Sequence, residues 1–279
     1  MRTESRRPPA RKRFGQHFLE PVWATKVVAA IAPQPDQVFL EIGPGPGAIT
    51  RPLASGCAGL VACEIDRDLA ATLGDEQLPG VRILEGDFLT LPIERLRDAL
   101  AEVAPTTASF RVAGNLPYNV ASPIMFRLVE LVRLGLPLRD ATIMLQREVA
   151  DRLLAVPATR EYGVLSVLIG HRALPTRLLN LPRGAFRPAP QVESSVVKLT
   201  FHGPEPPVLD ESVLAGLTAA VFSRRRKTMG NALLAYGGTT PTIAATLLGG
   251  AGIDPRRRPE TLAIWELCAV ADGLSKMKS

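Results

Sequence analysis

The chain has 279 residues, of which 46% are hydrophobic and 22% charged, so it can bury the core of one large domain or two. No apolar run approaches the roughly 18 residues that span a bilayer, and the Arg- and Pro-rich N-terminus lacks the apolar segment of a secretory signal, which argues against a membrane or secreted protein. The three cysteines lack the spacing of a zinc site, so we expect no metal and a reducing cytoplasm, and the net charge of +6 leaves a polyanionic partner or plain solubility open.

The first segment along the chain, residues 1–13, is basic and proline-rich and predicts a disordered arm. A cleavable transit peptide is the alternative, but sequence typical of a folded domain already begins at Phe14.

From residue 22 to residue 148, short apolar runs alternate with amphipathic stretches, a pattern typical of a doubly wound α/β sheet. We therefore predict a Rossmann-like fold. The predicted strands cover residues 38–42, 60–65, 81–84, 110–113 and 141–145, and helices are predicted at 93–103 and 123–133.

The second half predicts a helix at 162–171 and an antiparallel strand at 194–201 that closes the sheet. Residues 203–207, Gly-Pro-Glu-Pro-Pro, read as a linker because proline breaks both helix and strand pairing. Beyond the linker the periodicity is helical only, with helices predicted at 211–222, 227–234, 243–248 and 259–271. We expect one domain at 14–203, a small helical domain at 204–279, and a monomer, since no obvious dimerisation segment appears.

A glycine-rich turn, Glu41-x-Gly43-x-Gly45-x-Gly47, falls where the first predicted strand ends. Glycines at such a turn let the backbone approach a ligand closely. An ordinary turn and a dinucleotide fingerprint are the alternatives, because Gly43, Gly45 and Ala48 also fit the spacing G-x-G-x-x-A.

Two acidic residues at the next strand ends bear on this choice. Glu64 can accept hydrogen bonds from ribose hydroxyls, a feature that NAD enzymes share. Asp87 can accept from an adenine amino group while Phe88 covers the ring, and this favours S-adenosylmethionine (SAM) over NAD. A helix N-cap is the structural alternative for either acid.

The most informative stretch, Asn115-Leu116-Pro117-Tyr118, follows a predicted buried strand. The Asn115 side-chain oxygen and the Leu116 carbonyl can accept both protons of an amine on a flat base and aim its lone pair. Tyr118 offers a face on which such a base stacks. An ordinary turn is the alternative, since Asn and Pro are common turn residues.

These motifs resemble the ribosomal RNA adenine dimethyltransferases, and within them the branch that acts on bacterial small-subunit (16S) RNA. The resemblance runs from Arg11 to about Ala271. It lies in Phe14-Gly-Gln-His-Phe-Leu19, the 41–47 turn, Glu64-Ile-Asp66, Gly86-Asp87, Gly114-Asn-Leu-Pro-Tyr-Asn119, Leu145-Gln-Arg-Glu-Val149, Tyr162-Gly-x-Leu-Ser166, Phe186-x-Pro-x-Pro-x-Val-x-Ser194 and Arg225-Arg-Lys-Thr228.

The resemblance implies dimethylation of the N6 amines of two adjacent adenines near the 3′ end of 16S rRNA, within an assembling small subunit. It also implies roles for individual residues. The cofactor site would comprise Gln16, His17, Leu19, Gly43, Gly45, Glu64, Ile65, Asp87, Phe88 and Asn115, and the reacting base would meet Asn115, Leu116, Tyr118 and Phe186. One residue departs from the pattern, because we expect Asn where this chain has His17; a simple packing role for His17 is the alternative.

Basic residues gather at the ends of the chain. Residues 1–26 hold seven Lys/Arg against two Asp/Glu, whereas residues 27–202 hold 17 against 18. The run Arg224, Arg225, Arg226, Lys227 is expected to bind RNA phosphates, as are Arg256 to Arg258, with a solvated helical face as the alternative.

Three other functions stay open. A resistance-type methyltransferase acting on large-subunit RNA would share the fold and most cofactor residues. A non-catalytic nucleic-acid-binding relative would have lost cofactor residues that are intact here. DNA adenine and protein glutamine methyltransferases also use an Asn-Pro-Tyr type motif, but no inserted target-recognition domain is evident.

Overall fold

The computed structural model describes residues 16–104 and 109–278, which form two compact units. The first unit comprises the described residues up to Ala150 together with Pro175–Phe201, and the second comprises Asp151–Leu174 and the chain from His202 onward. The predicted basic arm at 1–13 lies outside the described residues.

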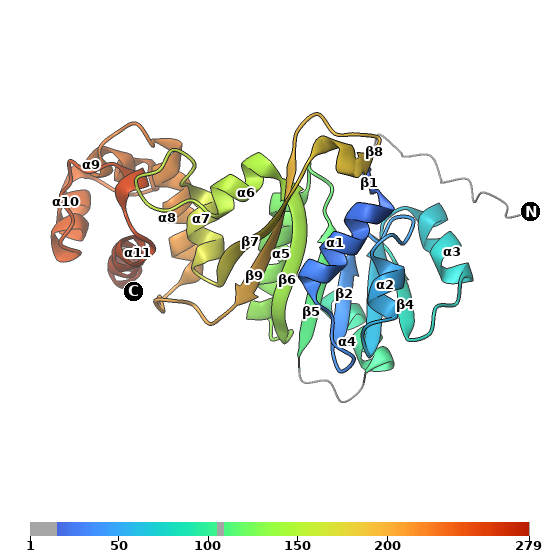
Figure 1. The fold of residues 1–279 in the computed structure, drawn as a ribbon. Coiled ribbons are helices and arrows are strands. Elements are labelled where there is room, and N and C mark those ends of the chain that lie inside the picture. Colours follow the sequence, from blue (N-terminus) through green and yellow to red (C-terminus); the bar gives the residue numbers. More distant parts are fainter. Residues whose placement is uncertain (1–15, 105–108, 279) are drawn as a thin grey trace, which may run out of the picture. The chain divides into compact units, whose positions relative to one another are not determined.

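The first unit is built on a seven-stranded sheet with the order β4-β3-β2-β5-β6-β9-β7 (Figure 1). Strands β2 to β6 are parallel, and β9 is antiparallel to β6. Their bounds are β2 Val38–Ile42, β3 Gly59–Glu64, β4 Val81–Glu85, β5 Phe110–Asn115, β6 Leu138–Gln146, β7 Ala173–Leu181 and β9 Ser194–Phe201. This arrangement confirms the predicted Rossmann-like α/β fold.

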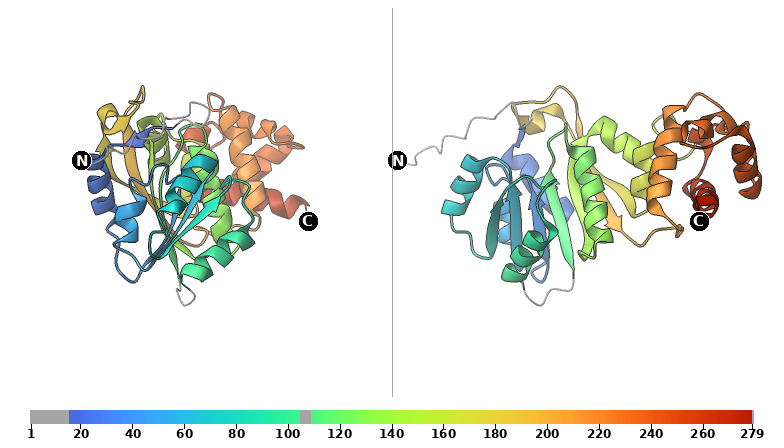
Figure 2. Two further views of the ribbon diagram at one scale, coloured as in Figure 1. Left: turned by 90° about the vertical axis from the view of Figure 1, so that its right-hand side faces the viewer. Right: turned by 180° about the vertical axis from the view of Figure 1, so that it is seen from behind.

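Helices cover both faces of the sheet, as a mostly parallel sheet requires. Figures 1 and 2 show α1 and α2 on one face and α4 and α5 on the other. The helices of this part of the chain are α1 Pro21–Ile31, α2 Thr50–Ala54, α3 Arg67–Asp75, α4 Ile93–Val103, α5 Ala121–Arg133 and α6 Arg147–Leu153.

Most predicted elements are present with small shifts at their ends, but the last helix, predicted at 259–271, is observed at Ile264–Lys278 after a 3₁₀ turn. Helix α4 and strand β9 have the predicted bounds, whereas β6 begins three residues earlier than predicted. Strand β7 was not predicted. Its apolar residues are interrupted by polar ones, Thr176, Arg177 and Asn180, and by Pro175. Proline is confined to edge strands such as this one because it has no N–H to donate.

A short ladder fixes the N-terminal segment against the first unit. Strand β1 (Phe18–Leu19) pairs antiparallel with β8 (Phe186–Arg187), so that Phe18 lies opposite Arg187 and Leu19 opposite Phe186. The Glu20 N–H donates to the Ala185 carbonyl at 2.9 Å and prolongs this contact.

A buried ion pair joins β5 to β6 inside the sheet. The Arg111 Nε lies 2.9 Å from Asp140 Oδ1, and the two side chains are 7% and 1% exposed. The guanidinium also donates to the Gln37 side chain and to the Ile31 carbonyl, so that it caps the C-terminus of α1.

The second unit is helical and has its own hydrophobic core. Its helices are α7 Val164–Gly170, α8 Glu211–Ser223, α9 Met229–Ala232, α10 Pro241–Gly250 and α11 Ile264–Lys278, with short 3₁₀ turns at Leu233–Ala235 and Pro259–Thr261. Asp210 caps α8 by accepting from the backbone N–H of Ser212 and Val213.

The division between the units differs from the predicted one. We expected residues 151–174 in the first domain, but they belong to the second unit. The physical reason is burial, because Tyr162 and Val167 pack in one core cluster with Leu217 of α8 and Leu267 of α11.

None of the helices in the described part of the chain is long and apolar enough to cross a membrane. All three cysteines are free.

Candidate active site

A pocket opens at the carboxyl ends of β2, β3 and β5, where the strand order reverses direction. Ligands of open α/β sheets bind at such switch points. The pocket holds about 700 Å³ of space between atoms, part of which is open to solvent. Its lining consists of Gln16, His17, Phe18, Leu19, Glu41, Gly43, Pro44, Gly45, Pro46, Ala48, Ile49, Glu64, Ile65, Asn115, Leu116, Pro117 and Tyr118.

The glycine turn after β2 forms one wall of the pocket. Gly43, Gly45 and Gly47 have φ values of +69°, +56° and +82°, a left-handed conformation that favours glycine. A Cβ on Gly45 would also lie 3.4 Å from the Phe18 ring, and a Cβ on Gly43 would lie 3.6 Å from the Asn115 carbonyl oxygen. The turn therefore lies close to both β1 and the end of β5.

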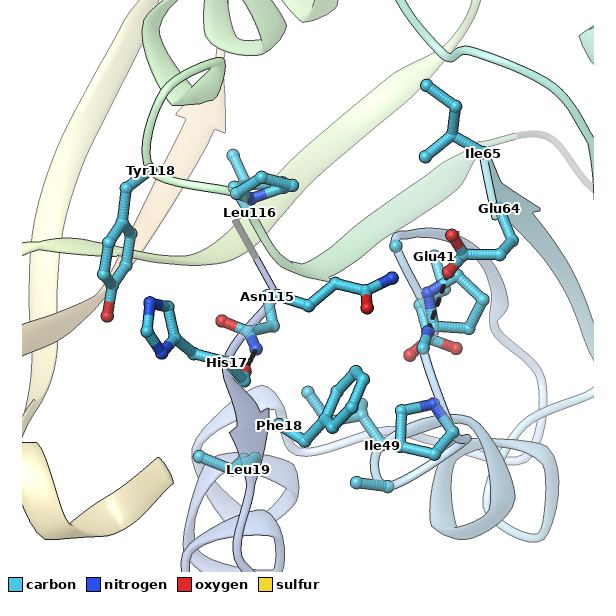
Figure 3. Close-up of a pocket in the computed structure, with 17 residues that line it drawn as sticks. His17, Phe18, Leu19, Glu41, Ile49, Glu64, Ile65, Asn115, Leu116 and Tyr118 are labelled. Carbon is cyan, nitrogen blue, oxygen red and sulfur yellow. Dashed lines mark hydrogen bonds between the residues drawn. The ribbon is translucent and has the colours of Figure 1, made fainter. Parts of the chain in front are cut away.

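Glu64 fastens the turn to the end of β3. Its Oε2 accepts from the Gly45 N–H at 2.9 Å (Figure 3). Its Oε1 accepts from the Asp66 N–H at 2.8 Å. Burial raises the pKa of this carboxyl group, although the backbone hydrogen bonds from Asp66 and Gly45 oppose the rise. A carboxylate has about four acceptor sites, so Glu64 keeps acceptor capacity for a ligand beside its backbone hydrogen bonds.

Asp87 and Phe88 are not among the residues that line the pocket. The Asp87 Oδ1 accepts from the Leu89 N–H at 3.0 Å, a local turn contact close to the N-cap alternative. Its second oxygen has no such backbone contact among the described residues, whereas the Phe88 side chain is buried. The structure thus places these two residues at the end of β4 but not in the pocket lining.

Glu41 lines the pocket and is almost completely buried. Within the described part of the chain, its Oε2 has no hydrogen-bond partner. Burial raises the pKa of this carboxyl group to about 8, the charge of Glu64 adds to the rise, and Thr50 and Arg51 oppose it. A buried carboxyl oxygen without a partner in a pocket wall fits a ligand that brings a hydrogen-bond donor.

This pKa predicts a pH-dependent stability. Between about pH 4.5 and pH 8 the folded chain keeps the Glu41 proton that the unfolded chain has released, so the free energy of unfolding falls as pH rises through this window. Glu41→Gln removes the titration. Between pH 4.5 and pH 8, we expect the free energy of unfolding of wild type to fall by a few kcal/mol more than that of the variant. Urea denaturation at several pH values measures both free energies. Parallel pH profiles of the two proteins would contradict this assignment.

The Asn115–Tyr118 turn forms the opposite wall. The Asn115 Nδ2 donates to the His17 carbonyl at 2.8 Å, so the side-chain Oδ1 is left to accept from a ligand. The Tyr118 hydroxyl shares a 2.7 Å hydrogen bond with the Ser194 hydroxyl, and burial raises the pKa of Tyr118. The structure therefore brings together three predicted residues, Asn115, Leu116 and Tyr118.

Gln16 and His17 also reach the pocket. The Gln16 amide donates to Asp66 at 3.3 Å, which ties the segment before β1 to the end of β3. The His17 ring stacks on Tyr118 with a centroid distance of 5.4 Å. The side chain at this unusual position is thus directed to Tyr118.

Phe186 is the clearest correction. We expected its ring to close the pocket, but the side chain is fully buried in a core cluster with Leu19 and Val196. Because Phe186 lies directly opposite Leu19 in the β1–β8 ladder, the two side chains share one face, and that face is the core. Phe18, on the alternate face, reaches the glycine turn instead.

Phe18, Ala48 and Ile49 also line the pocket, although the motifs assigned none of them to the SAM site and Ala48 was named only for the dinucleotide alternative. Phe18 lies inside the Phe14–Leu19 motif, between His17 and Leu19, which were both predicted to line the cofactor site. Its position in the motif could therefore have identified it. Ala48 and Ile49 follow the glycine turn, where apolar residues look like the start of an ordinary core helix.

Sequence comparison bears directly on this arrangement. The family model described as "Ribosomal RNA adenine dimethylase" matches residues 8–269, which is nearly the whole chain. The chain belongs to the ribosomal RNA adenine dimethylase family. This confirms the family that the motifs predicted.

Named members of the ribosomal RNA adenine dimethylase family are close in sequence. A ribosomal RNA small subunit methyltransferase A from Acinetobacter baylyi is 41% identical over 95% of this chain and 92% of its own length. The protein of the same name from Escherichia coli is 38% identical over 96% of this chain and 94% of its own length.

Solved structures share the fold of this ribosomal RNA adenine dimethylase family member. A dimethyladenosine transferase from Plasmodium falciparum superposes with a TM-score of 0.77 at 22% identity, over 94% of this chain and 98% of the other. The 23S rRNA methyltransferase ErmE superposes with a TM-score of 0.65 at 22% identity, over 92% and 99%.

The basic run of the second unit divides into two kinds of side chain. Arg224, Arg226 and Lys227 are exposed. Arg225 is partly buried, donates to the Thr159 carbonyl at 3.0 Å and lies 3.8 Å from Glu260. Three of the four residues are therefore available to a phosphate backbone, whereas Arg225 is engaged within the unit.

Proposed function

We propose that the chain transfers methyl groups from SAM to the N6 amines of two adjacent adenines near the 3′ end of 16S rRNA, in the assembling small ribosomal subunit of the cytoplasm. The observation that carries this proposal is the Asn115 side chain. It is held by the His17 carbonyl at the end of β5, and it lines the same pocket as the glycine turn and Tyr118.

The pocket fits SAM by its chemistry. The glycine turn allows a close approach of the ligand to the backbone, and Glu64 offers acceptors for ribose hydroxyls. The buried Oε2 of Glu41, which has no partner among the described residues, suits a hydrogen-bond donor of the ligand. Gln16, His17, Leu19 and Ile65 would border the cofactor, and Asp87 would take the adenine amine with its free oxygen while Phe88 supports that loop from the core. Bound SAM would supply an electrophilic methyl group on a sulfonium.

The chain's own contribution to the reaction is orientation. In the first transfer the Asn115 Oδ1 and the Leu116 carbonyl accept hydrogen bonds from both N–H groups of the target amine, and in the second transfer one of them accepts from the single N–H that remains. These contacts direct the nitrogen lone pair, and each methylated nitrogen then releases one proton to solvent. Tyr118 holds the base plane by stacking, a contact typically worth about 1–3 kcal/mol. No strong base is required, because the sulfonium is a good leaving group, so proximity and electrostatic orientation supply most of the rate.

The choice of RNA rests on the relatives. Those named above are small-subunit methyltransferases at about 40% identity over nearly their full length. Large-subunit RNA is the second candidate, because ErmE, a 23S rRNA methyltransferase, has the same fold.

The test is methyl transfer from labelled SAM to small ribosomal subunits that lack the modification, followed by nucleoside mass spectrometry. We expect dimethyladenosine in the small subunit and none in large subunits or duplex DNA in parallel reactions. Transfer to large subunits alone would favour the second candidate. SAM binding without transfer to any substrate would favour a non-catalytic role.

The exposed basic residues predict an affinity for RNA that depends on salt concentration. Replacing Arg224, Arg226 and Lys227 together by alanine should weaken RNA binding and flatten the plot of log K against log salt by roughly 2–3 units, because each lost phosphate contact removes about 0.7–0.9. Filter binding of 16S rRNA at several salt concentrations measures this slope.

Arg225→Ala is the matched control for the basic run. Because Arg225 contacts Thr159 and Glu260, its loss should lower the thermal stability of the second unit and leave the salt slope nearly unchanged. Equal slopes for the triple variant and wild type would rule out phosphate contact by this run.

A further inference from the structure

The His17 imidazole lies on one face of Tyr118, the residue on which the proposed function stacks the target adenine. The two rings are stacked, with centroids 5.4 Å apart and planes inclined by 24°. Both residues line the pocket, and Figure 3 shows the His17 ring between Tyr118 and the rest of the cavity. His17 therefore covers the side of Tyr118 that a base entering the pocket would meet.

The spacing of the two rings excludes a base between them. A ring inserted between two others needs two layers of contact, and carbon atoms in contact are about 3.5 Å apart or more, so the flanking rings must be at least about 7 Å apart. The observed 5.4 Å is too short. An adenine thus stacks on this face of Tyr118 only after the imidazole has left it.

The backbone of residue 17 can stay in place when its ring moves. The His17 carbonyl accepts from Asn115, and the following residue, Phe18, is paired with Arg187 in the β1–β8 ladder. The ring itself is held by two separate contacts, the stack on Tyr118 and a 2.8 Å hydrogen bond from Nδ1 to the Pro188 carbonyl. A rotation about the side-chain bonds releases both contacts and leaves Asn115 anchored.

We propose that the His17 imidazole holds the place of the target base on Tyr118 and is exchanged for the adenine when RNA binds. This proposal rests on the proposed function. Residue 17 is then a positioning residue with two roles. Its carbonyl orients Asn115, and its ring competes with the target base for the face of Tyr118. The identity of the side chain at this position consequently sets the affinity for the target base.

The experiment measures kcat and KM for unmodified small subunits with wild type, His17→Ala and His17→Asn. Alanine removes both ring contacts. Asparagine removes the stack but keeps an amide that can donate to the Pro188 carbonyl. Loss of an aromatic pair changes an equilibrium constant by a factor of about 2 to 12. We therefore expect KM for the subunit to fall by that factor in both variants.

His202→Ala is the matched control, since it removes the same side chain from the second unit, and its KM should equal that of wild type. Calorimetric SAM binding and thermal unfolding establish that each variant is folded. A KM that is unchanged in both His17 variants would overturn the proposal, and a raised KM would overturn it in favour of His17 as a contact of the bound base. Absence of transfer by wild type itself would instead overturn the proposed function, and this inference with it.

Discussion

Replacing Asn115 with alanine is expected to lower kcat for methyl transfer by about 10³-fold while the Kd for SAM changes less than about threefold. The size follows from the loss of one preorganised polar group in a catalytic site, typically 10²–10³-fold, together with poorer positioning of the amine. SAM binding persists because the glycine turn and Glu64 lie on other strand ends. Single-turnover transfer and calorimetry measure the two quantities separately.

Asn115→Asp is the informative companion variant. Its carboxylate keeps acceptor oxygens for the amine but loses the Nδ2 donor to the His17 carbonyl, and one carboxylate oxygen then faces that carbonyl. We expect activity at least about tenfold above that of Asn115→Ala and below that of wild type. Activity of the alanine variant within twofold of wild type would exclude the acceptor role of Asn115.

Replacing Asp140 with alanine is expected to lower the free energy of unfolding by about 3–5 kcal/mol, since the change leaves the buried Arg111 without its counter-charge. The remaining contacts of Arg111, with Gln37 and the end of α1, are with neutral groups and do not replace a carboxylate. Lys198, 3.6 Å from Asp140, loses a partner as well. Urea denaturation followed by circular dichroism measures the loss.

Asp36→Ala serves as the control for this prediction, because Asp36 is an exposed acid just before β2. Surface substitutions usually change the free energy of unfolding by less than about 0.5 kcal/mol. A combined change of Arg111 and Asp140 to methionine and leucine should recover much of the loss, as it removes both charges together. Equal stability of Asp140→Ala and Asp36→Ala would show that the pair contributes nothing.

The order of the elements and the identity of the pocket could be predicted because they depend on local patterns. A buried parallel strand needs a mostly apolar run, and the segments 38–42 and 110–113, with one charged residue each, meet that need by themselves. A backbone turn at positive φ needs glycine, so Gly43, Gly45 and Gly47 marked the ligand wall before any geometry was known. In parallel sheets the carboxyl ends of the strands share one edge, which brought Glu64 and Asn115 to the same pocket.

Features that depend on partners distant in the chain were settled by tertiary structure alone. Arg111 stands inside an apolar run, and only the pairing of β5 with β6 supplies Asp140 to neutralise it. Residues 151–174 belong to the second unit and not to the predicted domain, because Tyr162 is buried in one core cluster with residues of α8 and α11, which lie much later in the chain.

The positions of the aromatic rings around the target site were also settled by tertiary structure. Phe186 and His17 were both assigned to the site from sequence motifs, but a motif does not state which face a side chain takes. The register of the two-residue β1–β8 ladder directs the Phe186 side chain into the core. The hydrogen bond to the Pro188 carbonyl and the stack on Tyr118 hold the His17 imidazole over the proposed base position. Local patterns thus determined which residues gather at the strand ends, and long-range packing decided which way their side chains point, because side-chain direction depends on contacts that the neighbouring sequence does not contain.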